Sequence, residues 1–373
     1  GNIGIPGGSS STSNGATGYC GFKGMPAGAN PVAARVATGL LADFLAKGTA
    51  GGYPADIKLI YAAGGDIFNQ ASNARKIAQS LESVEFIVGQ DNFLTPTTRH
   101  ADIVLPATTP WERNDIHVPW AGAGHYAIYM KQAIQPYEDC RNDIDIFADL
   151  ARRVGIEGYS EKSEAEWLRE IACGPVEDFE AFVESGVVRL PPPKDAVAFA
   201  DEIRDPENHP FSTPSGRIEI YASSIADAPD PYGLGAIPPI PTWNGHDPTS
   251  ADHPLRYCSS KSRARTHSIH GNQSRLARVD PDNFWIHPTD AAARGIADGD
   301  MALVSSPYGA TRMTARVTED IAAGVVSIKE GAWFAPGEDG VDASGCANAL
   351  TRDATSPAGA MTYNSNAVQV KKL

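Results

Sequence analysis

The sequence predicts an α/β fold in which a partial parallel sheet is followed by a small carboxy-terminal β-barrel. A strand–helix–strand pattern within residues 57–105 supports the sheet, because such βαβ units build parallel sheets with right-handed crossovers. After His253, short β-prone runs alternate with turn residues, which is typical of a small barrel. The length of 373 residues and a hydrophobic content of 42% supply the cores of two or three domains.

Helices are predicted where apolar residues recur at helical spacing. The four ranges with this spacing are 31–47, 73–83, 143–153 and 160–172. Gly48 ends the first helix, and Ser72 or Asn73 is available as the N-cap of the second. Residues 1–30 are rich in Gly, Ser, Thr and Asn, so we expect an irregular loop there.

Strands are predicted from β-prone runs bounded by turn residues. They are expected at 57–61, 84–88, 101–105, 301–304, 311–317 and 325–328. The two strands around the Pro-Tyr-Gly turn at 307–309 form a hairpin, since apolar and polar residues alternate along the second of them. A short helix is expected over 286–295, entered through Pro288 and ended at Gly295.

Prolines cluster between about 187 and 250, and we interpret this stretch as a long surface connection. The predicted domains are therefore an α/β lobe over 1–155, a helical and proline-rich connection over 156–250, and a barrel over 251–373. The chain begins Gly1-Asn2 without an initiator Met, so we expect it to be a piece of a longer protein.

The composition restricts the partners. Against 45 Asp and Glu there are 31 Lys and Arg, and the net charge of −14 argues against nucleic acid, which rewards a basic face. Nothing resembles a signal peptide, and no apolar run approaches the ~18 residues that span a bilayer. The cysteines show no C-x-x-C spacing, so we expect small buried hydrophobes rather than a local metal motif. They are Cys20, Cys140, Cys173, Cys258 and Cys346.

The carboxyl ends of the predicted parallel strands offer the first candidate site. Ligands bind at this edge of open parallel sheets. Asp66 follows two glycines after the first strand, Gln90 and Asp91 end the second, and the hydroxyls of 95–99 suit a phosphate. A nucleotide is one interpretation and plain turns are the other, while the absence of G-x-G-x-x-G argues against an ordinary NAD enzyme.

The second candidate site is the run 259–268, which holds three cations and several hydroxyls. Arginine forks there match the oxygens of a pyrophosphate, although a solvated basic loop has the same composition. His267 and His270 lack a third ligand nearby, so no metal site is predicted. No G-x-S-x-G elbow supports a hydrolytic triad, and no catalytic residue is predicted. Asp143 is either a helix N-cap or a ligand contact.

Several of these segments resemble the molybdopterin oxidoreductase superfamily, in particular its dimethyl sulfoxide reductase type of catalytic subunit. They are GNIGIPGG at 1–8, GGDIFNQ at 64–70, QDNFLTPTTRHADIVLPATTPWERND at 90–115 and FSTPSGRIEIY at 211–221. The last third adds SRARTHSIHGN at 263–272, HPTDAAARGIADGD at 287–300, GVVSIKEGAWF at 324–334, GCANALT at 345–351 and NSNAVQV at 364–370.

This resemblance implies a fold and a set of cofactor contacts. The fold is the carboxy-terminal half of such a subunit, an incomplete nucleotide-binding lobe followed by a six-stranded double-psi β-barrel. Gln90 and Asp91 match residues that hold a guanosine, Asp143 matches the acid that recognises guanine, and Asp66 replaces a common Asn. The full set of implied contacts is Asp66, Gln90, Asp91, Arg113, Asp143, Ser260, Lys261, Arg263, Arg265, Thr266, His267, Ser268, Trp333, Asn348 and Asn366.

The resemblance also implies a function. The parent would be an anaerobic molybdenum oxidoreductase that transfers an oxo group to or from a small molecule such as dimethyl sulfoxide, using a molybdenum bis(molybdopterin guanine dinucleotide) cofactor. An iron–sulfur cluster in the missing half, an iron–sulfur electron-transfer subunit and a membrane anchor subunit would complete it, in the periplasm or at the membrane of a bacterium. We expect this piece alone to hold no cofactor and to be inactive. The alternative is an autonomous nucleotide-binding or structural module without redox activity.

Overall fold

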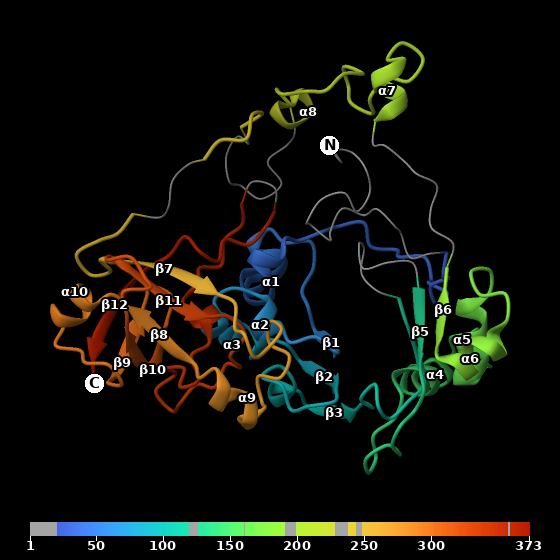
Figure 1. The fold of residues 1–373 in the computed structure, drawn as a ribbon, viewed down its shortest axis with the longest axis horizontal. Helices are drawn as coiled ribbons and strands as arrows, with labels where there is room; N and C mark the ends of the chain where they lie inside the picture. Colours follow the sequence, from blue (N-terminus) through green and yellow to red (C-terminus); the bar gives the residue numbers. More distant parts are fainter. Residues whose placement is uncertain are drawn as a thin grey trace. The chain divides into compact units, whose positions relative to one another are not determined.

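The computed structural model of the chain (Figure 1) describes residues 21–118, 126–159, 161–190, 199–227, 238–243, 248–356 and 359–373. The motif at 1–8, Cys20 and most of the predicted loop over 1–30 lie outside them. The chain divides into two compact units. Unit 1 is Gly1–Pro31, Pro106–Ala228 and Pro238–Ile240, and unit 2 is Val32–Leu105, Pro229–Ile237 and Pro241–Leu373. The domain borders expected at 155 and 250 stay predictions, since these units are defined by packing alone.

The βαβ prediction is confirmed in unit 2. The strands β1 (Leu59–Ala63), β2 (Phe86–Asp91) and β3 (Ile103–Pro106) lie in this order in one sheet, and β1 pairs with β2 in parallel. The helices α2 (Ile67–Gln70) and α3 (Ala74–Leu81) follow β1, and Asn73 is the N-cap of α3. Each strand begins two residues later than predicted, and the pairing of β1 with β2 runs from Leu59 and Phe86 to Ala63 and Gln90.

The helix predicted over 31–47 is wrong in its first half. A 3-10 turn at Thr38–Leu40 leads into α1 (Leu41–Lys47), and the residues before Thr38 are not helical. Val32 is 63% exposed, so the apolar spacing at that end does not mark a buried helical face.

The barrel prediction is also confirmed. The closed six-stranded barrel has the strand order β10-β8-β11-β7-β12-β9, and the predicted hairpin is the antiparallel pair β9 and β10. Its strands are β7 (Leu255–Ser260), β8 (Asn283–Ile286), β9 (Met301–Ser305), β10 (Ala310–Val317), β11 (Val325–Lys329) and β12 (Ala367–Lys372). Alternate residues of these strands fill the barrel core, among them Phe284, Ile286, Val326 and Ile328.

Two short helices accompany the barrel, α9 (Ser274–Val279) and α10 (Pro288–Ala292). The helix predicted over 286–295 is therefore shorter than expected. Ile286 belongs to β8, and the His287 side chain accepts a hydrogen bond from the backbone N–H of Thr289 as the N-cap of α10.

Unit 1 contains an antiparallel sheet that the sequence did not predict. It is built from β4 (Asp115–His117), β5 (Tyr126–Met130) and β6 (Val187–Arg189). The helices of this unit are α4 (Asp143–Val154), α5 (Glu164–Ala172), α6 (Phe179–Ser185), α7 (Ala200–Arg204) and α8 (Ser223–Ala226). The helix predicted over 160–172 begins at Glu164, because Ser163 and Glu166 form a capping box.

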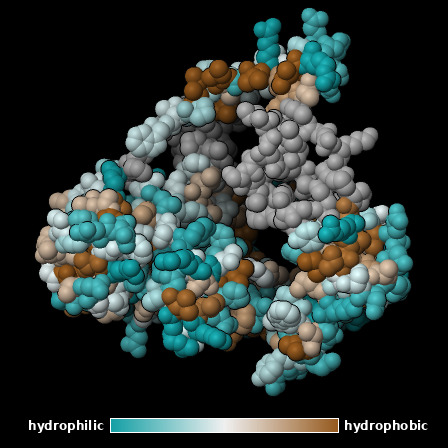
Figure 2. All heavy atoms as spheres, in the orientation of Figure 1, coloured by the Kyte–Doolittle hydropathy of each residue, from teal (hydrophilic) through white to brown (hydrophobic). Residues whose placement is uncertain are grey.

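The segment that carries α7 and α8 exposes much of its apolar surface. Figure 2 shows hydrophobic side chains gathered there, where Ile218 is 73% and Ile220 is 80% exposed. In the part of the chain that the structure describes, no helix is long and apolar enough to cross a membrane.

The expectation that the cysteines are buried is only partly correct. Cys346 is buried, but Cys140 and Cys258 are half-buried and Cys173 is exposed. Cys173 follows the last turn of α5 as its C-cap, a position at which a helix leaves the core.

The buried carboxylate of Asp342 organises the segment after β11. It accepts hydrogen bonds from the Thr311 hydroxyl (2.6 Å), from the backbone N–H groups of Ala335, Ser344, Gly345 and Cys346, and from the Ser344 hydroxyl. The ordered segment packs Phe334, Cys346 and Ala349 into the core of α2 and α3, with the Phe334 and Phe68 rings stacked 5.4 Å apart. The segment after β11 thus connects the barrel with the core of α2 and α3 in unit 2.

We predict that Asp342→Ala lowers the free energy of unfolding by at least about 3 kcal/mol, because several buried donors lose their acceptor. Denaturant unfolding followed by circular dichroism measures this change. Glu338→Gln is the matched control, since that exposed carboxylate lies in the same segment, and its effect should stay within about 0.5 kcal/mol. Equal stability of the two variants would contradict the role assigned to Asp342.

Candidate functional site

The carboxyl ends of β1 and β2 lie together, as the sequence predicts. The backbone N–H of Gly64 donates to the carbonyl of Gln90 at 2.9 Å. The Asp66 carboxylate is 9% exposed and accepts from the Thr97 hydroxyl (2.7 Å), the Thr97 backbone N–H (3.2 Å) and the Asn69 side chain. Asp66 therefore fixes the turn that follows β2. This residue was predicted to contact a cofactor, and in the structure its carboxylate has a structural role.

The other predicted residues of this edge are also engaged within the protein. Gln90 is fully buried and accepts from the Tyr61 hydroxyl at 2.5 Å. One carboxylate oxygen of Asp91 accepts from the backbone N–H groups of the two residues that follow it, at 2.8 and 3.3 Å. The hydroxyls of Thr95 and Thr98, predicted to suit a phosphate, lie 3.2 Å apart and bond to one another.

The basic loop that follows β7, residues 260–273, lies beside the end of β11. Strands β7 and β11 are parallel, and Ser260 pairs with Lys329, so Lys261 and Glu330 leave the barrel side by side. The Glu330 carboxylate accepts from Lys261 Nζ at 2.6 Å and lies 2.9 Å from His267 Nδ1. Glu330 thus holds two of the predicted cofactor contacts in one place.

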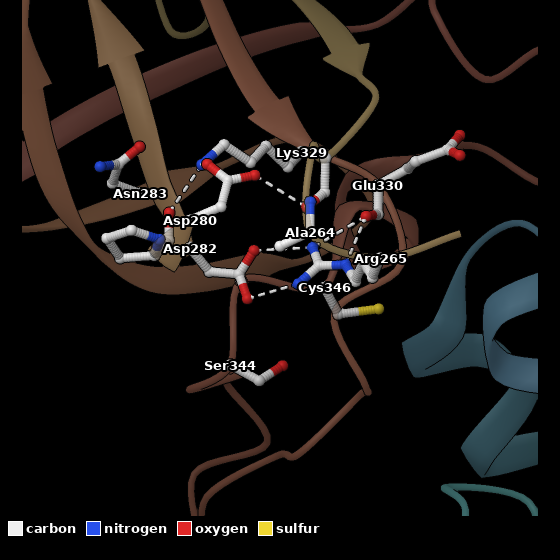
Figure 3. Close-up of polar contacts among 12 residues, drawn as sticks. Ala264, Arg265, Asp280, Asp282, Asn283, Lys329, Glu330, Ser344 and Cys346 are labelled. Carbon is white, nitrogen blue, oxygen red and sulfur yellow. Dashed lines mark hydrogen bonds and ion pairs between the residues drawn. The ribbon is translucent and has the colours of Figure 1, made fainter. Parts of the chain in front are cut away.

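Arg265 lies in the middle of the basic loop and points inward (Figure 3). Its side chain is 7% exposed and forms a two-pronged ion pair with Asp282, at 2.7 and 2.8 Å. Nε and Nη2 also donate to the carbonyl of Glu330, at 3.1 and 2.8 Å. Most of the guanidinium donors are therefore used to fasten the loop to the barrel.

Asp280 fastens the start of the basic loop. It accepts from the Ser262 hydroxyl (2.8 Å), from the backbone N–H of Arg263 (2.9 Å) and from Lys329 Nζ, as Figure 3 shows for the lysine. Burial by itself would raise the pKa of Asp280, but the hydrogen bonds from Lys329, Ser262 and Arg263 outweigh it and lower the pKa to about 2.

The rest of the basic loop packs closely on the chain after β11. Trp333 Nε1 donates to the carbonyl of Ser268 at 2.8 Å. A Cβ atom added at Gly331, whose φ is +90°, would lie 1.8 Å from the His267 carbonyl oxygen, so only glycine fits there. Among the described residues, the side-chain hydroxyls of Thr266 and Ser268 have no hydrogen-bond partner.

Two predicted contacts serve as internal links of unit 2. Asn348 Nδ2 donates to the carbonyls of Phe68 (3.0 Å) and Ala71 (2.9 Å), which ties the barrel side to α2. Asn366 is 3% exposed, donates to the Tyr363 carbonyl at 2.9 Å and accepts from the backbone N–H of Arg352 at 3.3 Å.

The two predicted contacts of unit 1 lie together. Arg113 Nη1 is 3.7 Å from a carboxylate oxygen of Asp143 and 2.6 Å from the carbonyl of Thr108. Asp143 is the first residue of α4, and the N-cap is Asn142, whose side chain accepts from the backbone N–H of Ile144. The N-cap alternative for Asp143 is thus wrong, because the helix begins one residue earlier than that alternative requires.

The sequence interpretation missed the acids that shape the basic loop. Asp280, Asp282 and Glu330 hold its cations and backbone, yet a chain with 45 acidic residues gives no reason to single out three of them. Their positions at the start of β8 and the end of β11 are the available signal. Within the described ranges no three His, Cys, Asp or Glu side chains lie close enough to hold a metal ion.

Two family models match the chain. Residues 1–153 match the molybdopterin oxidoreductase model, and residues 255–367 match the molydopterin dinucleotide binding domain. Dimethyl sulfoxide reductase DmsA of Haemophilus influenzae is 33% identical over 407 residues, covering 100% of this chain and 50% of that protein. The dimethyl sulfoxide/trimethylamine N-oxide reductase of Cereibacter sphaeroides is 36% identical over 338 residues, covering 83% of this chain and 40% of that protein.

A solved structure agrees on the fold. Acetylene hydratase from Pelobacter acetylenicus superimposes with a TM-score of 0.72 at 19% identity, over 91% of this chain and 47% of that one. The chain spans about half the length of the curated relatives it matches most fully. The basic loop over the barrel lies within the matched dinucleotide-binding domain, and the sheet lies within the matched oxidoreductase domain. Together these matches show that the chain belongs to the molybdopterin oxidoreductase superfamily.

Proposed function

We propose that this chain is the carboxy-terminal half of a molybdenum oxidoreductase that transfers an oxo group to or from a small molecule such as dimethyl sulfoxide. The observation that carries the proposal is the basic loop, which acids at the strand ends hold in a fixed shape inside the matched dinucleotide-binding domain. The S-oxide and N-oxide reductases among the relatives support the reaction class.

The residues of the basic loop fit a pyrophosphate-bearing group. In the described part of the chain, the Thr266 and Ser268 hydroxyls and the Arg263 guanidinium have no polar partner, and the Lys261 ammonium and the His267 imidazole lie beside Glu330 in the same loop. Such donors match phosphate oxygens. When bound, the molybdenum cofactor supplies two-electron oxo transfer, and this chain supplies binding and orientation.

The predicted contacts divide into two roles under this proposal. Those of the loop that keep free donors, Arg263, Thr266 and Ser268, would touch the cofactor. Arg265 would act through the loop, because Asp282 and Glu330 already occupy most of its donors. In unit 1 the Asp143 carboxylate, which is 44% exposed and lies 3.7 Å from Arg113 Nη1, would accept from the two N–H donors of a guanine.

The remaining features of the parent enzyme belong to the same proposal. We infer an iron–sulfur cluster in the other half, an iron–sulfur electron-transfer subunit with a membrane anchor subunit, and a periplasmic or membrane-associated location. This chain covers about half of each DmsA relative, which supports the inference that the parent enzyme has another half. We further infer that the chain alone is inactive and retains no cofactor. An autonomous nucleotide-binding module is the competing outcome of the test below.

The first prediction concerns activity. Expressed together with the coding sequence upstream of Gly1, the protein should contain molybdenum and reduce dimethyl sulfoxide with a reduced dye, whereas the chain alone should do neither. Metal analysis and dye oxidation measure both. Turnover by the chain alone would contradict its inactivity, whereas a longer protein that holds no molybdenum and reduces no substrate would favour the autonomous module without redox activity.

The second prediction concerns the basic loop in that longer protein. His267→Ala should weaken cofactor retention about tenfold, because one hydrogen-bonding side chain of the loop is lost. The guanine nucleotide released on denaturation measures retention independently of activity. His209→Ala, which removes an exposed imidazole in unit 1, is the matched control and should retain the wild-type amount. Equal retention by both variants would remove His267 from the site.

The third prediction concerns pH. The ordinary pKa of an Asp is 3.8 and that of folded Asp280 is about 2, a difference worth about 2 kcal/mol of stability. Because the folded pKa is the lower one, this contribution is present above pH 4 and lost as the pH falls toward 2. Asp280→Asn should therefore be less stable than wild type at pH 7, and the gap should close between pH 4 and pH 2.

Acid unfolding followed by tryptophan fluorescence tests the third prediction. Glu319→Gln, which neutralises an exposed acid on the same barrel, is the control and should follow the wild-type curve. A gap between Asp280→Asn and wild type that stays constant down to pH 2 would contradict the role of the Asp280 charge.

A further inference from the structure

A basic pocket lies on the outside of the barrel, apart from its core. It consists of two cavities of about 230 and 320 Å³ that share four lining residues. The shared residues are Arg263, Asp280, Trp285 and Lys329. We call the two cavities together the outer pocket.

The strands of the barrel form the floor of the outer pocket. Arg316 of β10 pairs with Trp285 of β8, Trp285 pairs with Ser327 of β11, and Ser327 pairs with Cys258 of β7. These residues form one row across four neighbouring strands. The row faces outward, because the alternate residues Phe284 and Ile286 of β8 are fully buried in the core.

The lining is cationic although the chain carries a net charge of −14. Lys261, Arg263, Arg316 and Lys329 line the outer pocket with only two acids, Asp280 and Asp320. The Asp280 carboxylate is neutralised by its ion pair with Lys329. Lys261 is neutralised in the same way by Glu330. The positive charge that remains lies on the two arginines and exceeds the single charge of Asp320, which favours an anionic ligand.

Two of these cations keep their donors free. Throughout the described ranges, the guanidinium groups of Arg263 and Arg316 form no ion pair and no hydrogen bond. The Arg316 guanidinium lies over the Trp285 ring, 5.0 Å from its centroid, which orients it without using its N–H groups. Asp280 fixes the backbone of Arg263 at the rim through a 2.9 Å hydrogen bond. Both arginines thus line the pocket with guanidinium N–H groups that bond to no described residue.

We propose that the outer pocket is a phosphate-binding site in which Arg263 and Arg316 hold the phosphate oxygens and Trp285 forms the wall. Planar guanidinium forks match tetrahedral oxyanions and form charge-assisted hydrogen bonds with them. The phosphate is either free or carried by a nucleotide, and both sources share this chemistry. The site shares Arg263 with the predicted cofactor contacts, whereas Arg316 and Trp285 are not among them, so a variant of Arg316 tests the outer pocket separately from the oxidoreductase proposal.

Titration of the chain with inorganic phosphate tests this inference. Calorimetry measures binding. Alkylation gives a second measure, because Cys258 lines the larger cavity and bound phosphate should protect it. Mass spectrometry locates the modified peptide. The exposed Cys173 serves as an internal control for the reagent. Arg316→Gln should weaken phosphate binding at least tenfold and abolish protection of Cys258. Lys371→Gln, which removes one exposed charge from β12, should bind within twofold of wild type.

A parallel titration with guanosine diphosphate distinguishes the sources. If guanosine diphosphate binds much more tightly than phosphate, and its affinity falls in Arg316→Gln, the outer pocket is a nucleotide site. If the two ligands bind with equal affinity, it is a site for free phosphate. Unchanged phosphate affinity in Arg316→Gln overturns the proposal. An equal loss in Lys371→Gln also overturns it, since general electrostatic attraction would then explain the binding. Circular dichroism of both variants shows that they are folded.

Discussion

The buried carboxylate of Asp342 is the constraint on which unit 2 depends. Its two oxygens collect six hydrogen bonds from β10 and from the segment after β11, and no water is needed to satisfy them. The segment shaped in this way carries Phe334, Cys346 and Ala349 to the core formed by α2 and α3. The sheet edge and the basic loop belong to one compact unit, and Asp342 shapes the segment that connects them.

The same principle shapes the basic loop. Three acids at strand ends hold cations and backbone of a loop whose composition alone suggests a solvated, mobile segment. Fixing the loop in advance lowers the conformational entropy that binding would otherwise cost. Within the loop, Arg265 has a structural role, whereas the hydroxyls of Thr266 and Ser268 bond to no described residue. Rigidity and free donors come from different residues of one loop.

The elements that depend on local patterns could be predicted from the sequence. The βαβ unit and the β9–β10 hairpin follow from periodicity and turn residues, and both were confirmed. The helix over 31–37 was wrong because apolar spacing without burial does not form a face, as the exposed Val32 shows. The acid partners of the basic loop could not be predicted, because strand pairing between distant segments brings them to it. Glu330 follows β11, which pairs with β7, and Asp280 and Asp282 precede β8, which pairs with β11.

Unit 2 is assembled from chain segments at opposite ends of the sequence. Asn348 bonds to Phe68 and Ala71 across 280 and 277 residues, and Asn73 bonds to Thr351 across 278. During synthesis the apolar face of α2 and α3 must therefore wait until the last strands emerge, which makes folding slow and exposes that face to misassembly. A chain that ends before residue 334 would leave Phe68 without the Phe334 ring that stacks on it, and such a chain is a natural client for chaperones.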